Sequence, residues 1–276
     1  MKLSSLFVAT AFSALVLLSV SALVLIRFKS KLYWQRWLTW FAISISFSVS
    51  YLVGQTCFNV LVCLVAFVMM FELISLLKLD NFSTTLVLLA TWIDFFEIIQ
   101  GRSAAVFFWM IPVMMFVLNL AEAQKARKLK SAVVGMYGSL LISLSFVQLV
   151  QYPDRSLALI LAVACFDVAA FIGGKSLGKL PILKLNFTPK TSPNKTVAGL
   201  VTGSVALLIV LLVLGKLTLL SFGLVVLGAA LGDYLESLVK RFAGVKDAGT
   251  WLPGFGGLLD RFDSLILLAP LAVFIF

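Results

Sequence analysis

Acidic and basic side chains alternate densely between Gly232 and Ser264, with spacings that suit chemistry on phosphate groups. Residues three or four positions apart share a face of a helix, so this segment presents two acidic faces. The first face carries Asp233, Glu236, Ser237 and Lys240, and the second carries Asp260 and Asp263. Because Mg²⁺ prefers carboxylate, water and substrate phosphate oxygens, the pattern predicts metal-assisted chemistry on phosphates. The alternative is a structural ion-pair network at a helix hairpin.

The connection between the two faces is compact and rich in glycine. Gly254, Gly256 and Gly257 would let the backbone approach a ligand closely. Further charged groups at the same place are Lys240, Arg241, Lys246, Asp247 and Arg261. Since lysine and arginine bind phosphate groups, we expect the bases to hold phosphates and the acids to face a metal ion.

Another carboxylate, Asp167, lies in an apolar segment just ahead of a glycine and lysine cluster. The cluster consists of Gly173, Gly174, Lys175, Gly178 and Lys179. An ionisable group inside a membrane span costs about 2.5–3.5 kcal/mol on insertion scales, so it usually faces a cavity, a partner or an ion. We expect Asp167 to support the phosphate site. The alternative is a helix end with a glycine stop and lysines that reach the membrane surface.

A polar block from Thr191 to Gly199 leads directly into an apolar segment. Hydroxyls and free backbone N–H groups at a helix start favour an anion, so Ser192, Lys195 and Thr196 are candidates for phosphate binding. The alternative is a helix N-cap followed by a lysine that sets membrane topology.

The composition is that of an integral membrane protein. Of the 276 residues, 62% are hydrophobic and only 12% are charged, whereas soluble domains carry about 25% charged residues. The net charge of +10 comes mainly from short loops between apolar runs, which argues against nucleic-acid binding. No histidine is present and the three cysteines form no CxxC pair, which argues against a zinc or haem site and a disulfide framework.

Apolar runs long enough to cross a bilayer, which takes about 20 helical residues, recur along the chain. An all-α fold of about ten spans is predicted, with nine as the alternative. The spans are 3–26, 37–54, 56–78, 83–100, 103–122, 131–151, 156–174, 197–214, 217–239 and 262–276. The first is expected to be a retained helix rather than a cleaved signal peptide, because its apolar run is long and the stronger positive cluster follows it.

Basic residues support this count. With ten spans, the loops 27–36, 78–82, 124–130, 175–196 and 240–261 share one side of the membrane. That side holds every basic residue except Lys2, Arg102, Arg155 and Lys216, so it is expected to be cytoplasmic, with both termini outside. We expect residues 1–150 to serve packing and lipid contact, and residues 151–276, with loops 175–196 and 240–261, to form the catalytic membrane domain.

The segment from Ser237 to Asp263 resembles the signature of the phosphatidate cytidylyltransferases (CDP-diacylglycerol synthases). Its pattern here is Ser237-x2-Lys240-Arg241-x4-Lys246-Asp247-x-Gly249-x2-Leu252-Pro253-Gly254-x-Gly256-Gly257-x2-Asp260-Arg261-x-Asp263. Asp167 with its glycines, and Ser192-Pro193-x-Lys195-Thr196, resemble two further blocks of that family in the same order. The resemblance covers about residues 160–270.

The resemblance implies transfer of a cytidylyl group from CTP to phosphatidate, giving CDP-diacylglycerol and pyrophosphate, with Mg²⁺ required and a second cation allowed for. It implies a protein of the bacterial inner membrane, surrounded by membrane lipid, with its site facing the cytoplasm and with a homodimeric state. The expected metal-side acids are Asp260, Asp247, Asp233, Asp263 and Asp167. Asp260→Asn is expected to abolish activity with little effect on stability. The positively charged residues expected to act in catalysis are Lys246 and Arg261. The expected phosphate-binding residues are Ser192, Lys195, Thr196, Ser237, Lys240, Arg241, Gly254, Gly256 and Gly257.

Two positions depart from the family pattern. Phe255 stands where the family has histidine, and Ala198 stands where it usually has an acid. Phenylalanine can neither bind a metal nor donate a hydrogen bond to phosphate. The departures leave three alternatives open, which are a different lipid phosphate as substrate, a lower rate, and a silent homologue that acts as a binding partner.

An ion-coupled transporter is a further alternative, because acids recur within the apolar segments. They are Asp94, Glu97, Asp167, Asp233 and Glu236. No inverted repeat is evident, and a transporter has no need of the dense Lys-Asp-Gly loop. Asp94 and Glu97 have no assigned role in either reading.

Overall fold

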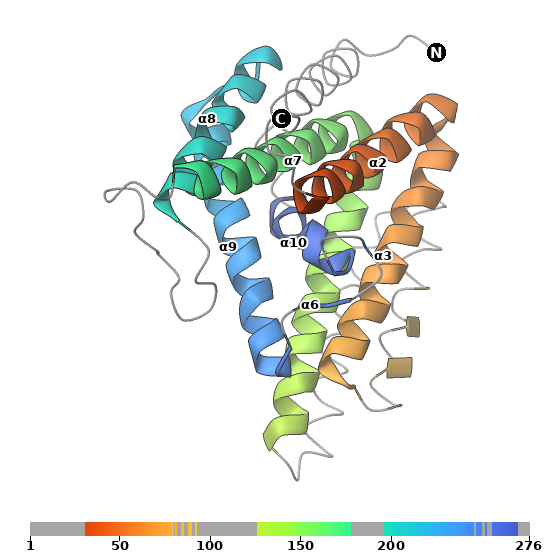
Figure 1. Cartoon of the computed structure of the whole chain (residues 1–276). Helices are drawn as coiled ribbons and strands as arrows, with labels where there is room; N and C mark the ends of the chain where they lie inside the picture. Colours follow the sequence, from red (N-terminus) through yellow and green to blue (C-terminus); the bar gives the residue numbers. More distant parts are fainter. Residues whose placement is uncertain are drawn as a thin grey trace.

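The computed structural model describes residues 31–79, 81, 84–85, 88–89, 92, 126–177, 196–245, 247–249, 252 and 256–269. The named elements of this part of the chain are all helices (Figure 1), and an isolated bridge pairs Leu252 with Gly256. The helices are α2 (Lys31–Val53), α3 (Gln55–Leu77), α6 (Ala126–Gln151), α7 (Pro153–Ser176), α8 (Val197–Val213), α9 (Leu219–Ala243) and α10 (Leu259–Leu268). The predicted all-α class is confirmed for these residues.

Three of the described helices, α3, α7 and α9, are long and apolar enough to cross a membrane. They correspond to predicted spans 56–78, 156–174 and 217–239. The predicted spans 3–26 and 103–122, and most of 83–100, lie outside the described residues. The number of ten spans and the sides of the two termini therefore stay predictions.

Several helices begin before the apolar run that predicts them. The described part of α2 includes residues 31–36, ahead of the predicted span 37–54, and that of α6 includes residues 126–130, ahead of the predicted span 131–151. Lysine and arginine have good helix propensity, so a helix continues through a basic flank that hydropathy excludes from the span. Hydropathy marks the part of a helix that suits lipid, and not the whole helix.

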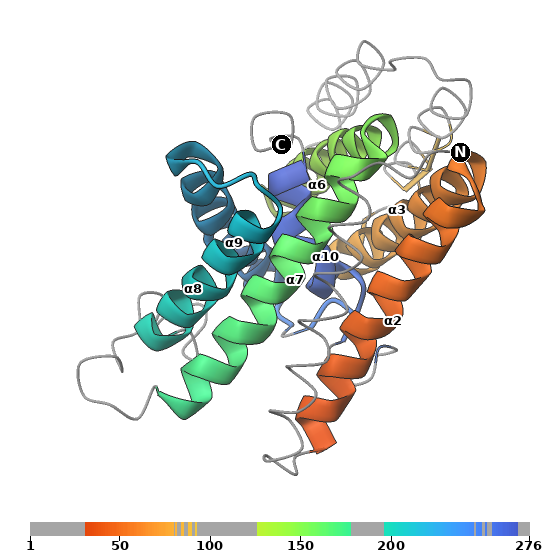
Figure 2. The same cartoon turned by 90° about the horizontal axis from the view of Figure 1, so that it is seen from above.

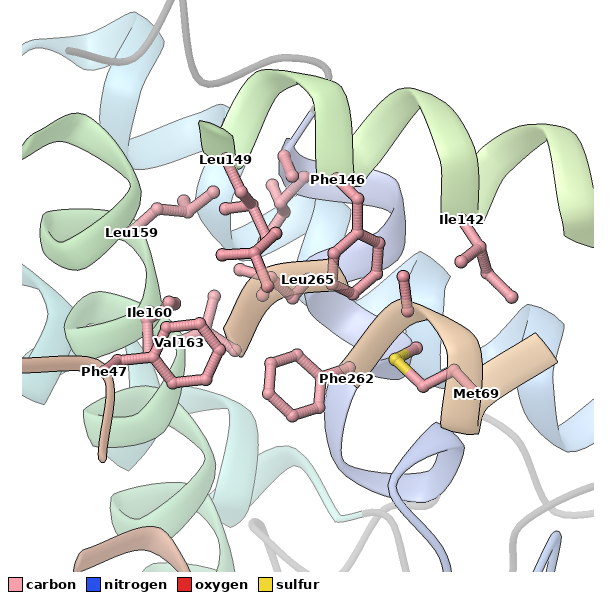
Figure 3. Close-up of a cluster of buried hydrophobic side chains, with 14 of the residues drawn as sticks. Phe47, Met69, Ile142, Phe146, Leu149, Leu159, Ile160, Val163, Phe262 and Leu265 are labelled. Atoms are coloured by element: carbon pink, nitrogen blue, oxygen red, sulfur yellow. The ribbon is translucent and has the colours of Figure 1, made fainter. Parts of the chain in front are cut away.

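A hydrophobic core joins α10 to α2, α3, α6 and α7. Phe262 of α10 is 1% exposed, and its ring centroid lies 6.1 Å from that of Phe47 in α2. Figure 3 shows these two rings beside Met69 of α3 and beside side chains of α6 and α7, namely Ile142, Phe146, Leu149, Leu159, Ile160 and Val163. Close van der Waals packing of these side chains against the neighbouring helices holds the short helix α10 in place.

Helices α9 and α10 approach each other closely at two glycines one turn apart. A Cβ atom at Gly232 would lie 2.6 Å from the carbonyl oxygen of Asp263, and one at Gly228 would lie 2.2 Å from Leu268 Cδ2. Between them, the Ser264 hydroxyl donates a hydrogen bond to the Ala229 carbonyl, at 3.2 Å. Figure 2 shows α10 near the middle of the molecule, beside α9 and close to α3 and α7, in agreement with its packing contacts.

Small residues also bring α7 and α8 together. A Cβ at Gly199 would lie 2.8 Å from the Ala170 carbonyl oxygen, and a Cβ at Gly173 would overlap the Thr202 side chain. The Thr202 hydroxyl lies 3.0 Å from the Ala169 carbonyl oxygen across the interface. Such close packing of small residues is typical of helices that associate in a membrane.

The end of α3 lies beside the start of α6. A Cβ at Gly135 would lie 3.2 Å from Leu79 Cδ1, and one at Gly138 would lie 2.8 Å from Leu73 Cδ2. The predicted loops 78–82 and 124–130 therefore start or end at neighbouring points of the bundle, as expected if they face the same side of a membrane.

Candidate active site at the junction of α9 and α10

Asp233, Glu236 and Asp263 meet where α9 packs on α10. One carboxylate oxygen from each residue lies within 4.8 Å of the other two. The two α9 acids share a face because they are three positions apart, and α10 supplies the third because Gly232 lets the backbone at Asp263 approach. Three carboxylates at this separation repel one another, so the arrangement favours a bound cation.

Glu236 is the most enclosed of the three, with 8% of its surface exposed. Its Oε2 forms an ion pair with the Lys240 ammonium, whereas no described group donates a hydrogen bond to the buried Oε1. A buried carboxylate oxygen without a donor is costly, and a divalent cation would compensate for that cost. A set of carboxylate oxygens is also what Mg²⁺ and Mn²⁺ prefer, so the residues present fit such a cation.

Lys240 joins this acidic cluster to the first turn of α10. Its Nζ lies 2.8 Å from Asp260 Oδ1, and the same ammonium pairs with Glu236 one helical turn earlier. The side chains of Lys240, Glu236 and Asp260 are 14%, 7% and 4% exposed, respectively. One cation therefore neutralises two nearly buried carboxylates from two helices.

Asp260 organises the loop that precedes α10. Its Oδ2 accepts hydrogen bonds from the backbone N–H groups of Ala248 at 2.9 Å and of Gly257 at 2.8 Å, in addition to the Lys240 contact at Oδ1. Asp260 precedes the predicted last span. Burial alone would raise its pKa, but the hydrogen bonds from Lys240 and the Gly257 N–H, and the Lys240 charge, lower the pKa below its ordinary value. Asp260 is therefore held as a carboxylate.

Arg261 lies among the carboxylates of three helices. Burial lowers the pKa of its guanidinium, while the nearby charges raise it in part. These charges belong to Asp263, Asp167, Asp260 and Asp233. An arginine remains protonated under such conditions, so Arg261 brings a fixed positive charge into the acidic site. The structure thus brings Asp167 of α7 to the same place as the α9 and α10 acids.

Glu72 of α3 is a site residue that the sequence analysis missed. It is 8% exposed, and its two carboxylate oxygens accept hydrogen bonds from the backbone N–H groups of Leu258 at 3.0 Å and of Leu259 at 2.6 Å. Glu72 is the only acid within α3, and an isolated acid in an apolar span is the signal that could have found it. Its partners, more than 180 positions away, could not be read from the sequence.

The two described glycines of the paired-glycine motif lie against carboxylates of the protein itself. Gly256 has a φ of +92°, which favours glycine, and a Cβ there would lie 2.5 Å from Asp260 Oδ2. A Cβ at Gly257 would lie 2.5 Å from Glu72 Oε1. These glycines therefore let the Asp260 and Glu72 carboxylates reach the loop backbone. The sequence had suggested that they let a ligand approach the backbone.

The other predicted residues around this loop are spread more widely. Ser237 is buried on α9, whereas Arg241 is exposed and donates from Nη1 to the Val245 carbonyl oxygen at 3.2 Å. Asp247 is exposed, and a Cβ atom at Gly256 would lie 2.9 Å from Asp247 Cβ. Lys246, Gly254 and Phe255 lie outside the described residues.

At the start of α8, Thr196 is the helix N-cap, and its hydroxyl accepts a hydrogen bond from the Gly199 N–H at 3.2 Å. This contact matches the N-cap alternative for that block. Ala198 is fully buried in α8, and its carbonyl accepts a hydrogen bond from the Thr202 hydroxyl at 2.9 Å. Ser192 and Lys195 lie outside the described residues.

Comparison with known proteins identifies one family. The model of a cytidylyltransferase family matches residues 34–276. A phosphatidate cytidylyltransferase of Helicobacter pylori strain 26695 is 45% identical over 117 residues, which cover 39% of this chain and 41% of that protein. One of Mycobacterium leprae is 40% identical over 141 residues, covering 46% of this chain and 43% of that protein.

A relative without an assigned activity is similar to the same extent. The uncharacterized protein YnbB of Escherichia coli K12 is 42% identical over 112 residues, covering 38% of this chain and 36% of that protein. The chain thus matches less than half the length of each of these three relatives.

Proposed function

This chain belongs to the cytidylyltransferase family, and from that premise we propose that it transfers a cytidylyl group from CTP to phosphatidate. The products are CDP-diacylglycerol and pyrophosphate. The two relatives named as phosphatidate cytidylyltransferases support this choice of substrate. The main support is that the carboxylates of Asp233, Glu236 and Asp263 lie close together. Lys240 and Arg261 lie beside them, so acids that can bind a cation and basic side chains that can bind phosphate share one site.

We propose that Asp233, Glu236 and Asp263 hold a divalent cation, with Mg²⁺ favoured by its preference for carboxylate and phosphate oxygens. Such a cation, when bound, polarises phosphoryl oxygens and stabilises negative charge on a leaving pyrophosphate. Asp260 serves the same site from a distance, because it orients Lys240 and the loop before α10.

The reaction needs no nucleophile from the protein. An oxygen of the lipid phosphate attacks the α-phosphorus of CTP, and the bond from that phosphorus to the oxygen shared with the β-phosphate breaks. Arg261 and Lys240 offer positive charge to the phosphates, and hold them in line. Positioning and electrostatic stabilisation would supply most of the acceleration.

We propose that the site faces the cytoplasm of a bacterial cell from its inner membrane. The support is the concentration of basic residues in the loops that flank the site, together with the three helices long enough to span a bilayer. Phosphatidate would then enter sideways from the lipid, and CTP would enter from the water at the ends of the spans.

The test is an assay of the purified full chain in lipid nanodiscs, with CTP labelled in its α-phosphate and with a panel of lipid phosphates. We expect label in the lipid extract with phosphatidate, dependent on Mg²⁺ and absent after chelation with EDTA. Asp263→Asn is the matched inactive variant, and Asp154→Asn is the control, because Asp154 contacts Tyr51 between α2 and α7 instead of the site.

Three results would contradict the proposal. Binding of CTP without any labelled lipid would favour a silent homologue, and label only with another lipid phosphate would change the substrate. Equal labelling by wild type and Asp263→Asn would remove the acidic cluster from the reaction.

A further inference from the structure

We propose that Glu72 is a positioning residue that sets the place of the catalytic first turn of α10, an inference that rests on the proposed function. The Glu72 carboxylate spans two successive backbone donors, with Oε1 3.0 Å from the Leu258 nitrogen and Oε2 2.6 Å from the Leu259 nitrogen. Asp260, Arg261 and Asp263 follow within the next five residues. A shift of Leu258 and Leu259 would therefore move all three site residues.

Helix α10 depends on this contact because it has no N-cap side chain of its own. Its N-cap residue is Leu258, whose side chain provides no hydrogen-bond acceptor. The first N–H groups of a helix need acceptors, and its positive end favours a negative charge. Glu72 supplies both from another helix, and Asp260 takes the preceding Gly257 N–H at 2.8 Å.

The loop backbone is shaped around the Glu72 carboxylate. A Cβ at Gly257 would lie 2.5 Å from Glu72 Oε1, and one at Gly249 would lie 3.1 Å from the same oxygen. Because a protein carboxylate already occupies the Leu258 and Leu259 N–H groups, these groups are closed to a substrate phosphate. Substrate phosphates then have the basic side chains of Lys240 and Arg261 as their partners.

The variants Glu72→Gln and Glu72→Ala test this role in the full chain. Glutamine retains an oxygen for one N–H but opposes the other with its own NH₂ group, and alanine removes both acceptors. Since a displacement of about 1 Å can cost about 10²-fold in rate, we expect kcat to fall roughly tenfold in Glu72→Gln and roughly hundredfold in Glu72→Ala. The KM for CTP should change less than about threefold, because the variants leave the phosphate-binding side chains in place.

Hydrogen exchange measured by mass spectrometry gives a readout that does not depend on activity. In Glu72→Ala the peptide covering residues 256–262 should exchange at least about tenfold faster, whereas peptides from 141–151 and 157–170 should be unchanged. Asp154→Asn is the matched control, since it also removes a carboxylate that joins two helices, and it should leave both kcat and the 256–262 exchange as in wild type.

Each outcome decides the inference. A kcat within twofold of wild type in Glu72→Ala, unchanged exchange at 256–262, or faster exchange over the whole chain would overturn it, the last because Glu72 would then support the fold in general. If the wild-type chain labels no lipid phosphate, the proposed function fails, while the exchange experiment still shows whether Glu72 holds the start of α10.

Discussion

The ammonium of Lys240 lies 2.8 Å from Asp260 Oδ1 and also pairs with Glu236, so one side chain of α9 ties the acidic cluster to the first turn of α10. This arrangement connects the two acidic faces that the sequence predicts on either side of the glycine-rich loop. It also means that the charges of the site depend on one another, which the following predictions test.

Lys240→Met should weaken both the fold and the reaction. It leaves two carboxylates, 7% and 4% exposed, without their shared cation. Removal of one partner of a buried ion pair costs about 3–5 kcal/mol, so the thermal unfolding midpoint in detergent should fall clearly. Lys216→Met removes an equal charge from the loop between α8 and α9 and serves as the control. The double variant Lys240→Met with Glu236→Gln should recover part of the stability, and an unchanged midpoint in Lys240→Met alone would contradict the prediction.

Gly232→Ala should separate the metal-side acids. The added Cβ would lie 2.6 Å from the Asp263 carbonyl oxygen and 2.8 Å from Ser264 Cα, so α10 must move away from α9. We expect the transfer rate to fall about 10²-fold. Gly223→Ala, on the same helix with open space around its Cβ, should leave the rate unchanged and stabilise α9 by about 0.5–1 kcal/mol. Equal rates in the two variants would show that the close approach has no part in the site.

Removal of one carboxylate from the cluster should weaken cation binding. Asp263→Asn and Glu236→Gln should each raise the Kd for Mn²⁺, measured by electron paramagnetic resonance on the full chain, by at least about tenfold. The physical reason is that a neutral amide offers a cation less electrostatic attraction than a carboxylate does. Asp154→Asn, remote from the cluster, should bind Mn²⁺ as wild type does. Wild-type affinity in both cluster variants would place the cation elsewhere.

Asp260→Asn should now reduce stability as well as activity, in contrast to the small effect on stability expected from the sequence. Asp260 accepts hydrogen bonds from Ala248, Gly257 and Lys240, and the amide would present NH₂ to at least one of these donors. A lost hydrogen bond to a charged group costs about 1.5–3 kcal/mol. The thermal midpoint should fall accordingly. A wild-type midpoint with no activity would instead support a role confined to the metal.

Much of the helical frame could be predicted because apolar runs of span length need helices in lipid. The predicted edges of α8, at 197 and 214, agree with the helix to within one residue. Helices α2 and α6 extend ahead of the predicted spans 37–54 and 131–151, since basic flanks continue a helix without being apolar. The pairing of Asp233 with Glu236 on one face also followed from helical spacing alone.

The role of Glu236 shows where spacing stops being informative. Periodicity placed it on the face of Asp233, but the predicted metal set did not include it and preferred Asp260 and Asp247. Which acids converge depends on how α10 lies against α9, and that is decided by the contacts at Gly228 and Gly232. In the structure Asp247 is exposed and Asp260 is occupied by backbone N–H groups, whereas Glu236 faces Asp263.

By itself, the sequence determined the membrane class, the helical fold and the segment that carries the chemistry, because these depend on composition and on local spacing. Only the tertiary structure decided that Glu72 holds the start of α10 and that Lys240 joins Glu236 to Asp260. The contacts of Glu72 with Leu258 and Leu259, and of Lys240 with Asp260, link different parts of the bundle, up to 187 positions apart, and no local pattern encodes which buried N–H group a distant carboxylate will meet. Packing fixes that choice, because small residues set how closely the helices approach.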